Sequence, residues 1–230
     1  MKESHMRVLL VGAKGRMGRT IVDLAMAERN IEVVAQCDLG DAIAPAMANA
    51  DVTIDFSHAD VIEEICRAAT EHRKPLVIGT TGHSQAQREL IQKTARSMPV
   101  VLASNFSVGV NALFALTRRA GEILREFDVS IVETHHKTKK DAPSGTAKTL
   151  AQIAKGTRKV DKEIPIESVR EGEVVGEHSV TFAGRGERLE LTHRAESREI
   201  FARGALRAAE WVVGKPAGLY SMQDVLGLGL

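Results

Sequence analysis

A basic loop in the second half of the chain carries side chains suited to acid–base chemistry on an anion. His135 and His136 are followed within four residues by Lys137, Lys139 and Lys140. Histidine titrates near neutral pH and can supply a proton, whereas lysine stays charged and can hold an anion. The loop therefore predicts a site for a small anionic substrate that is protonated during its reaction.

The same loop leads into the predicted start of a helix. Pro143 stops the loop and Ser144 is a good N-cap residue, which leaves the first-turn amides of Gly145 and Thr146 for a ligand. Such amides favour a carboxylate or a phosphate. Together with the lysines, they predict a dianionic substrate. The ordinary interpretation is a structural histidine pair beside a solvated lysine-rich loop.

A glycine-rich turn follows the first predicted strand. It reads GAKGRMG over 12–18 and leads directly into a predicted helix, so backbone amides can approach a pyrophosphate there. Asp38 ends the second predicted strand about 20 residues later, where a carboxylate can bind a ribose hydroxyl. Lys14 and Arg16 could compensate a 2′-phosphate. The pattern predicts a dinucleotide cofactor, and the alternative is a glycine turn that binds nothing.

Short apolar strands alternate with helices in the first half of the chain. The predicted strands are 7–11, 31–37, 52–56, 75–79 and 99–104, and the predicted helices are 17–28, 60–70 and 85–96. Continuous apolar strands are typical of a parallel sheet buried on both faces, so the pattern predicts a doubly wound α/β layer of the Rossmann type. The link 38–52 is short for a full crossover helix plus strand, so we expect a trimmed layer.

The second half has a different pattern. Helices are predicted at 111–124, 145–154 and 200–213, and strands at 128–133, 173–182 and 187–193. The last two strands alternate apolar and polar residues, as strands with one covered face do. We therefore predict an α+β mixed-sheet domain over 107–214 and a dinucleotide-binding domain of 6–106 with 215–230. The two links, at 106–110 and 214–216, are the expected hinges.

Composition argues against several other classes of protein. The 31 Lys+Arg and 30 Asp+Glu leave a net charge of +1, so no overall field favours nucleic acid or a membrane surface. Aromatic residues make up 3%, too few for a surface that stacks single-stranded bases. No apolar run approaches the roughly 18 residues of a membrane span. Residues 1–5 are left out of the fold interpretation, and the absence of a secretory signal predicts a cytoplasmic protein.

A metal site is not expected. The two cysteines, Cys37 and Cys66, cannot form a disulfide framework or a four-thiolate zinc site. Adjacent histidines are a weak sign of a metal when no carboxylate or cysteine lies at ligand spacing. We therefore predict no bound metal.

The chain resembles the bacterial dihydrodipicolinate reductases (4-hydroxy-tetrahydrodipicolinate reductases) of lysine biosynthesis. The resemblance runs from about Val8 to Leu226 and includes the stretches GAKGRMGRTI, VTIDFS, VIGTTG, SNFSVGVN, ETHHKTKKDAPSGTA, GERLELTHRAESREIFARGALRAA and GLYSMQDVLGL. It implies NAD(P)H-dependent reduction of a small cyclic dicarboxylate, 4-hydroxy-tetrahydrodipicolinate, to tetrahydrodipicolinate in the diaminopimelate and lysine pathway. It also implies a nucleotide domain completed by the C-terminal tail, and an inserted substrate domain whose sheet builds a homotetramer.

The resemblance further implies roles for individual residues. His135 matches the acid–base residue, and Lys139 matches a proton donor that also binds a substrate carboxylate. The implied substrate contacts are His136, Lys139, Ser144, Gly145 and Thr146. The implied cofactor contacts are Gly12, Ala13, Lys14, Gly15, Arg16 and Met17 at the pyrophosphate, Asp38 at the adenosine ribose, and Gly79, Thr80, Thr81, Ala103, Ser104, Asn105 and Phe106 near the nicotinamide.

Two departures from the family pattern bear on the cofactor. The chain is shorter than most members between Asp38 and Val52, and Leu39 stands where members often have a basic residue. We therefore expect NADH to be used at least as well as NADPH, with Lys14 and Arg16 possible partners of the latter.

Other classes of function remain open from the sequence alone. One is a regulatory protein that senses the cofactor without chemistry, and another is a reductase of a different small acid. A third class, a purely structural interaction module, is disfavoured because it would give the glycine loop and Asp38 no function. The pairing of His135 with Lys139 favours an enzyme.

Overall fold

The computed structural model describes residues 5–157 and 163–228. These residues form two compact units, each considered by itself. One unit contains the described residues up to Phe106 together with those from Glu199 onward, and the other spans Ser107–Arg198. The chain therefore returns to the first unit between Arg198 and Glu199, whereas the sequence placed this boundary at Gly214.

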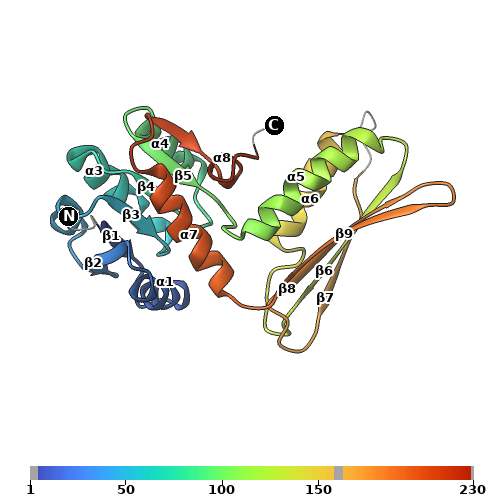
Figure 1. Cartoon of the computed structure of the whole chain (residues 1–230), viewed down its shortest axis with the longest axis horizontal. Helices are drawn as coiled ribbons and strands as arrows, with labels where there is room; N and C mark the ends of the chain where they lie inside the picture. The colour runs from blue at the N-terminus through green and yellow to red at the C-terminus, as the bar shows by residue number, and fades with distance from the viewer. Residues whose placement is uncertain (1–4, 158–162, 229–230) are drawn as a thin grey trace. The chain divides into compact units, whose positions relative to one another are not determined.

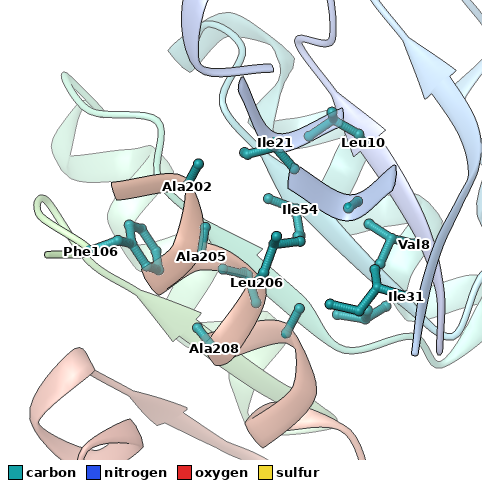
Figure 2. Packing of buried hydrophobic residues seen from close by; sticks show 14 of the residues in the cluster. Val8, Leu10, Ile21, Ile31, Ile54, Phe106, Ala202, Ala205, Leu206 and Ala208 are labelled. Atoms are coloured by element: carbon teal, nitrogen blue, oxygen red, sulfur yellow. The ribbon is translucent and has the colours of Figure 1, made fainter. Parts of the chain in front are cut away.

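The last long helix explains the different boundary. Helix α7, Glu199–Val212, packs against helix α1 and the central strands of the first unit. Its apolar stripe could have covered either sheet, and only the tertiary contacts assign it. Figure 2 shows side chains of α7, such as Ala205 and Leu206, gathered with Val8 and Ile54 of the strands.

The first unit is built on a parallel sheet of six strands. In spatial order these are β10 (Gly218–Tyr220), β5 (Pro99–Leu102), β4 (Leu76–Ile78), β3 (Val52–Asp55), β1 (Met6–Val11) and β2 (Ile31–Cys37). All neighbouring pairs are parallel. The predicted Rossmann-type layer is confirmed, and β10 was not predicted as a strand.

Helices cover both faces of this sheet, which explains the continuous apolar strands. Helix α1 (Arg16–Ala27) and α7 lie on one face, and α2 (Ile43–Ala48), α3 (Ile62–His72) and α4 (Gln85–Ala95) lie on the other. Along β1, Val8 and Leu10 belong to one core, whereas Leu9 and Val11 belong to the other. The six-residue α2 is the short link expected between β2 and β3. The short segments η1 (Ala59–Val61) and α8 (Met222–Val225) complete the unit.

The second unit has a mixed sheet of four strands. Their order is β7 (Ile166–Arg170), β6 (Asp128–His135), β8 (Gly176–Ala183) and β9 (Arg188–Ala195), with β6 and β7 parallel and the other pairs antiparallel. Helices α5 (Val108–Ile123) and α6 (Gly145–Gly156) cover one face (Figure 1). The predicted α+β mixed sheet is confirmed, although β7 was missed because its half-buried residues show no clear alternation.

Candidate functional site

The glycine loop follows β1 at the amino end of α1. Gly12 has a φ of +85°, and a Cβ there would lie 2.4 Å from the carbonyl oxygen of Phe56. A Cβ at Gly18 would lie 2.2 Å from the carbonyl oxygen of Gly12. Both positions therefore require glycine, because the backbone itself fills the space that a side chain would need. Gly15 is the N-cap of α1 and, among the described residues, no side chain caps this helix end.

Asp38 lies against the glycine loop. Its carboxylate accepts a hydrogen bond from the backbone N–H of Lys14, with N–O distances of 3.1 and 3.2 Å. The ammonium of Lys14 is 4.0 Å from the same carboxylate and its side chain is 81% exposed. Asp38 thus holds the loop in place, a role that the sequence did not indicate. The uncapped helix end and the glycine cradle fit a dinucleotide pyrophosphate.

The other predicted cofactor residues lie at the carboxyl ends of neighbouring strands. Gly79, Thr80 and Thr81 follow β4, and Ala103, Ser104, Asn105 and Phe106 follow β5. Ligands bind at this end of an open α/β sheet. A Cβ at Gly79 would lie 2.3 Å from the ring of Phe56, whose centroid is 5.6 Å from that of Phe106. The structure therefore brings these two stretches together through Phe56.

A buried acid at the end of β3 was missed. Asp55 is 1% exposed and accepts hydrogen bonds from the backbone N–H and the hydroxyl of Ser57. The same Ser57 amide lies 2.9 Å from the hydroxyl oxygen of Thr80. Burial raises the pKa of Asp55. Its position at a strand end, like that of Asp38, was the available signal.

In the second unit, His135 is the last residue of β6 and is buried. Its Nδ1 contacts Oε2 of Glu133, two residues earlier on the same face of the strand. Glu133 is fully buried, and its Oε1 accepts hydrogen bonds from Nη2 of Arg170 at 2.8 Å and from the backbone N–H of Ser144 at 3.3 Å. Burial raises the pKa of Glu133, but the hydrogen bond from Arg170 and the neighbouring His135 outweigh it and lower the value to about 2.

A second buried histidine completes this cluster. His178 on β8 lies edge-on to His135, with ring centroids 5.1 Å apart. Its Nε2 is 3.1 Å from the hydroxyl oxygen of Ser144, which also accepts the backbone N–H of Ala147 as the N-cap of α6. Burial lowers the pKa of His178 to about 4. Glu133 begins the stretch ETHHKTKKDAPSGTA but received no role from the sequence, and His178 lies outside every motif considered.

The three lysines of the predicted loop differ in their burial and in the contacts that they make. Lys139 is half-buried, and its ammonium donates to Oδ1 of Asp141 at 2.7 Å, whereas Lys137 and Lys140 are exposed. Only Lys139 of the three lysines is placed beside the histidine cluster, where its charge helps to lower the pKa of His135, although burial is the main cause. Burial and the nearby cations Lys139 and Arg170 therefore favour neutral imidazole at His135.

The other predicted substrate contacts lie at the two ends of the loop. Nδ1 of His136 is 2.8 Å from the hydroxyl oxygen of Thr138, and its Nε2 is 3.3 Å from a guanidinium nitrogen of Arg198. Gly145 begins α6, and apart from its chain neighbours and the backbone of α6 itself, no atom of the described residues lies within 4 Å of where its Cβ would be. Ser144 is 3% exposed and its polar groups bond within the protein, so its role as a substrate contact stays a prediction.

The expectation that no carboxylate lies near the histidines is wrong. Ligand atoms of Glu133, His135 and His178 all lie within 4.8 Å of one another. The guanidinium of Arg170 nevertheless contacts Oε1 of Glu133, the carboxylate oxygen that does not contact His135. Its positive charge disfavours the binding of a metal cation at this cluster. The absence of a metal remains our prediction.

The fold and these residues define a class of protein. A parallel sheet with a glycine loop at α1, joined to an α+β unit that presents a histidine–lysine loop, is typical of dinucleotide-dependent oxidoreductases. Residues 6–106 match the family model for the dihydrodipicolinate reductase N-terminus, and residues 109–226 match the model for its C-terminus. The chain belongs to the dihydrodipicolinate reductase family.

Individual relatives agree with this assignment. The chain is 47% identical to a 4-hydroxy-tetrahydrodipicolinate reductase of Akkermansia muciniphila over 96% of this chain and 98% of the relative. It is 43% identical to one of Zymomonas mobilis over 99% of each. A dipicolinate-bound dihydrodipicolinate reductase from Paenisporosarcina sp. TG-14 superposes with a TM-score of 0.82 at 25% identity, covering 96% of this chain and 98% of that one.

A helix suited to crossing a bilayer would need a long apolar stretch. Within residues 5–157 and 163–228, no helix has the length and apolar character for this.

Acid should destabilise the protein through His178. Its pKa is about 4 when folded, below the ordinary 6.5, so between these pH values the unfolded chain binds a proton that the folded one does not. Stability should therefore fall as pH drops from 6.5 to 4, by on the order of 3 kcal/mol from this group. His178→Gln should flatten this fall, as measured by melting temperature against pH. The exposed His58→Gln serves as the control, and an unchanged pH slope in His178→Gln would contradict the assignment.

Proposed function

We propose that this chain catalyses the NAD(P)H-dependent reduction of 4-hydroxy-tetrahydrodipicolinate, through dihydrodipicolinate, to tetrahydrodipicolinate, a step of diaminopimelate and lysine biosynthesis. The observation that carries the proposal is the pairing of buried His135 with Glu133 next to Lys139 and the start of α6. Membership of the reductase family and the names of its relatives support it.

The first unit would hold the cofactor. The glycine loop 12–17 and the amino end of α1 would bind the pyrophosphate, with Asp38 near the adenosine ribose. Gly79–Thr81 and Ala103–Phe106 would line the nicotinamide end. The bound NADH or NADPH supplies the hydride.

The second unit would bind and orient the dicarboxylate. Lys139, His136 and the first-turn amides at Gly145 and Thr146 would hold its two carboxylates, since a cation and a helix N-terminus both favour negative charge. Reduction of the conjugated ring drives electron density toward the imine nitrogen. Fixed positive groups stabilise that charge without having to reorganise. His135 then supplies or relays the proton that the ring nitrogen takes up.

The uncovered face of the second sheet supports a homotetramer. In the described part of this unit, helices cover one face only, and Val132 on β6 is 37% exposed on the other. Val132 lies in register with Ser179, whose hydroxyl is 2.8 Å from that of Thr192 on β9. A broad strand face of this kind suits pairing with a second copy through small polar and apolar side chains.

The catalytic assignment predicts large losses of turnover. Replacing His135 with Gln, or Lys139 with Ala, should lower kcat on the order of 10²-fold or more, because each removes a group that handles the proton or the carboxylate. A coupled assay with freshly made aspartate-semialdehyde condensation product and NADH measures this. The exposed Lys93→Ala on α4 is the matched control. Turnover near that of the unmodified protein in both site variants would refute the proposed function.

Cofactor preference should depend on position 39. Leu39 is 96% exposed directly after Asp38, so no cation there offsets a 2′-phosphate. We expect kcat/KM with NADH to be at least equal to that with NADPH. Leu39→Arg should raise the NADPH-to-NADH ratio by roughly tenfold, the worth of one charge-assisted contact. A strong NADPH preference in the unmodified protein would contradict this, and Leu39→Gln controls for loss of the apolar side chain.

The proposed assembly predicts a defined effect of one exposed residue. Val132→Asp should convert the tetramer to smaller species, because it buries a charge in each copy of the interface. Light scattering coupled to size exclusion measures the mass. Val213→Asp, at a similarly exposed valine of the first unit, should leave the tetramer intact. A monomer in the unmodified protein would exclude the assembly.

A further inference from the structure

We propose that Glu133 is a positioning residue for His135, which fixes the hydrogen on Nδ1 of the imidazole and so makes Nε2 the nitrogen that exchanges a proton with the substrate. Its kinetic consequences rest on the proposed function. Its structural content does not, because it concerns which nitrogen of one buried ring carries hydrogen.

The strand geometry places the two groups side by side. Glu133 and His135 are two residues apart on β6, so their side chains leave the same face of the strand. Both are buried, whereas Val132 on the opposite face is exposed. Oε2 of Glu133 contacts Nδ1 of His135 directly. The strand conformation of β6 therefore places the two side chains together, and their contact does not depend on a loop.

The other oxygen of Glu133 is already occupied. Oε1 accepts a hydrogen bond from Nη2 of Arg170 on β7 at 2.8 Å and from the backbone N–H of Ser144 at 3.3 Å. Arg170 also donates to the carbonyl oxygen of Asp141 at 2.7 Å. The carboxylate is held on one side by two donors and is ionised, since its pKa is about 2. An ionised carboxylate only accepts hydrogen bonds, so the hydrogen must lie on Nδ1 of His135.

A glycine leaves space beside Nε2 of His135. Gly176 begins β8, and a Cβ there would lie 3.1 Å from Nε2 and 3.3 Å from Cδ2 of His135. His178 packs edge-on against the same ring. The ring thus has Nδ1 bound to a carboxylate and Nε2 facing a position without a side chain. This arrangement leaves Nε2 as the working nitrogen.

The charged and titratable groups around His135 come from several elements. Glu133 lies on β6, Arg170 on β7 and His178 on β8, while Lys139 and Asp141 lie in the loop after β6. Glu133 opposes the cations and burial, which both favour the neutral ring. Removing its charge should therefore make His135 harder to protonate.

Glu133→Gln tests the assignment in the full chain. The Arg170 guanidinium requires an acceptor, so the amide oxygen should face it and the amide NH₂ should face Nδ1 of His135. The hydrogen must then move to Nε2. Two-bond ¹⁵N–¹H spectra of histidine-labelled protein should show Nδ1–H for His135 in the unmodified chain and Nε2–H in the variant. We expect kcat to fall on the order of 10²-fold and KM for the dicarboxylate to stay within about threefold. Because His135 gives up a proton, the basic limb of the kcat–pH profile should move to lower pH.

Two further variants separate positioning from general stability. Glu133→Asp retains a carboxylate and should keep the Nδ1–H form with partial activity. Glu71→Gln makes the same acid-to-amide change on the exposed surface of α3 and should match the unmodified protein in every measurement. A Glu133→Gln protein that keeps Nδ1–H and turns over within twofold of the unmodified chain overturns the proposal.

The unmodified chain alone also decides the question. If its His135 carries hydrogen on Nε2, the proposal is wrong whether or not any variant folds. If the unmodified chain shows Nδ1–H but does not reduce the dicarboxylate with either cofactor, the proposed function fails while the positioning role of Glu133 stands.

Discussion

A buried carboxylate that is shared by a guanidinium and an imidazole is the constraint on which the second unit depends. Glu133 is fully buried, and an ionised group in such a place is stable only when its oxygens are paired. Arg170, His135 and the amide of Ser144 supply that pairing from β7, β6 and the start of α6. Loss of one partner would leave a buried charge uncompensated. The requirement to pair this carboxylate therefore fixes three elements relative to one another.

The same constraint anchors the loop that we propose as the binding site. The segment between His135 and Ser144 starts and ends at residues that contact Glu133, so both of its ends are anchored. Lys139 then needs only its contact with Asp141 to be held close to the histidine. In the first unit, close backbone packing holds the glycine loop in place. Gly12 and Gly18 have no side chains, so the loop can pack directly against the backbone of Phe56 and against its own backbone. Each unit thus presents its site from a rigid support.

Much of this could be predicted from the sequence, and the misses have physical causes. The strands of the first unit other than β10 were evident because burial on both faces makes them continuously apolar, and the start of α6 was marked by Pro143 and Ser144. Glu133, Arg170 and His178 were missed because they come together only through strand register across β6, β7 and β8. The boundary between the two units at Arg198 was not predicted, because the apolar residues of α7 do not indicate which of the two sheets this helix covers.

A crystal structure of the protein with NADH and dipicolinate, an unreactive cyclic dicarboxylate, tests the central claim most directly. The account predicts one carboxylate at Lys139, the other at the amino end of α6, and the ring nitrogen within hydrogen-bond reach of Nε2 of His135, with Glu133 still bound to Arg170. A diacid bound away from this loop, or a His135 ring turned so that Nδ1 faces the ligand, would contradict it.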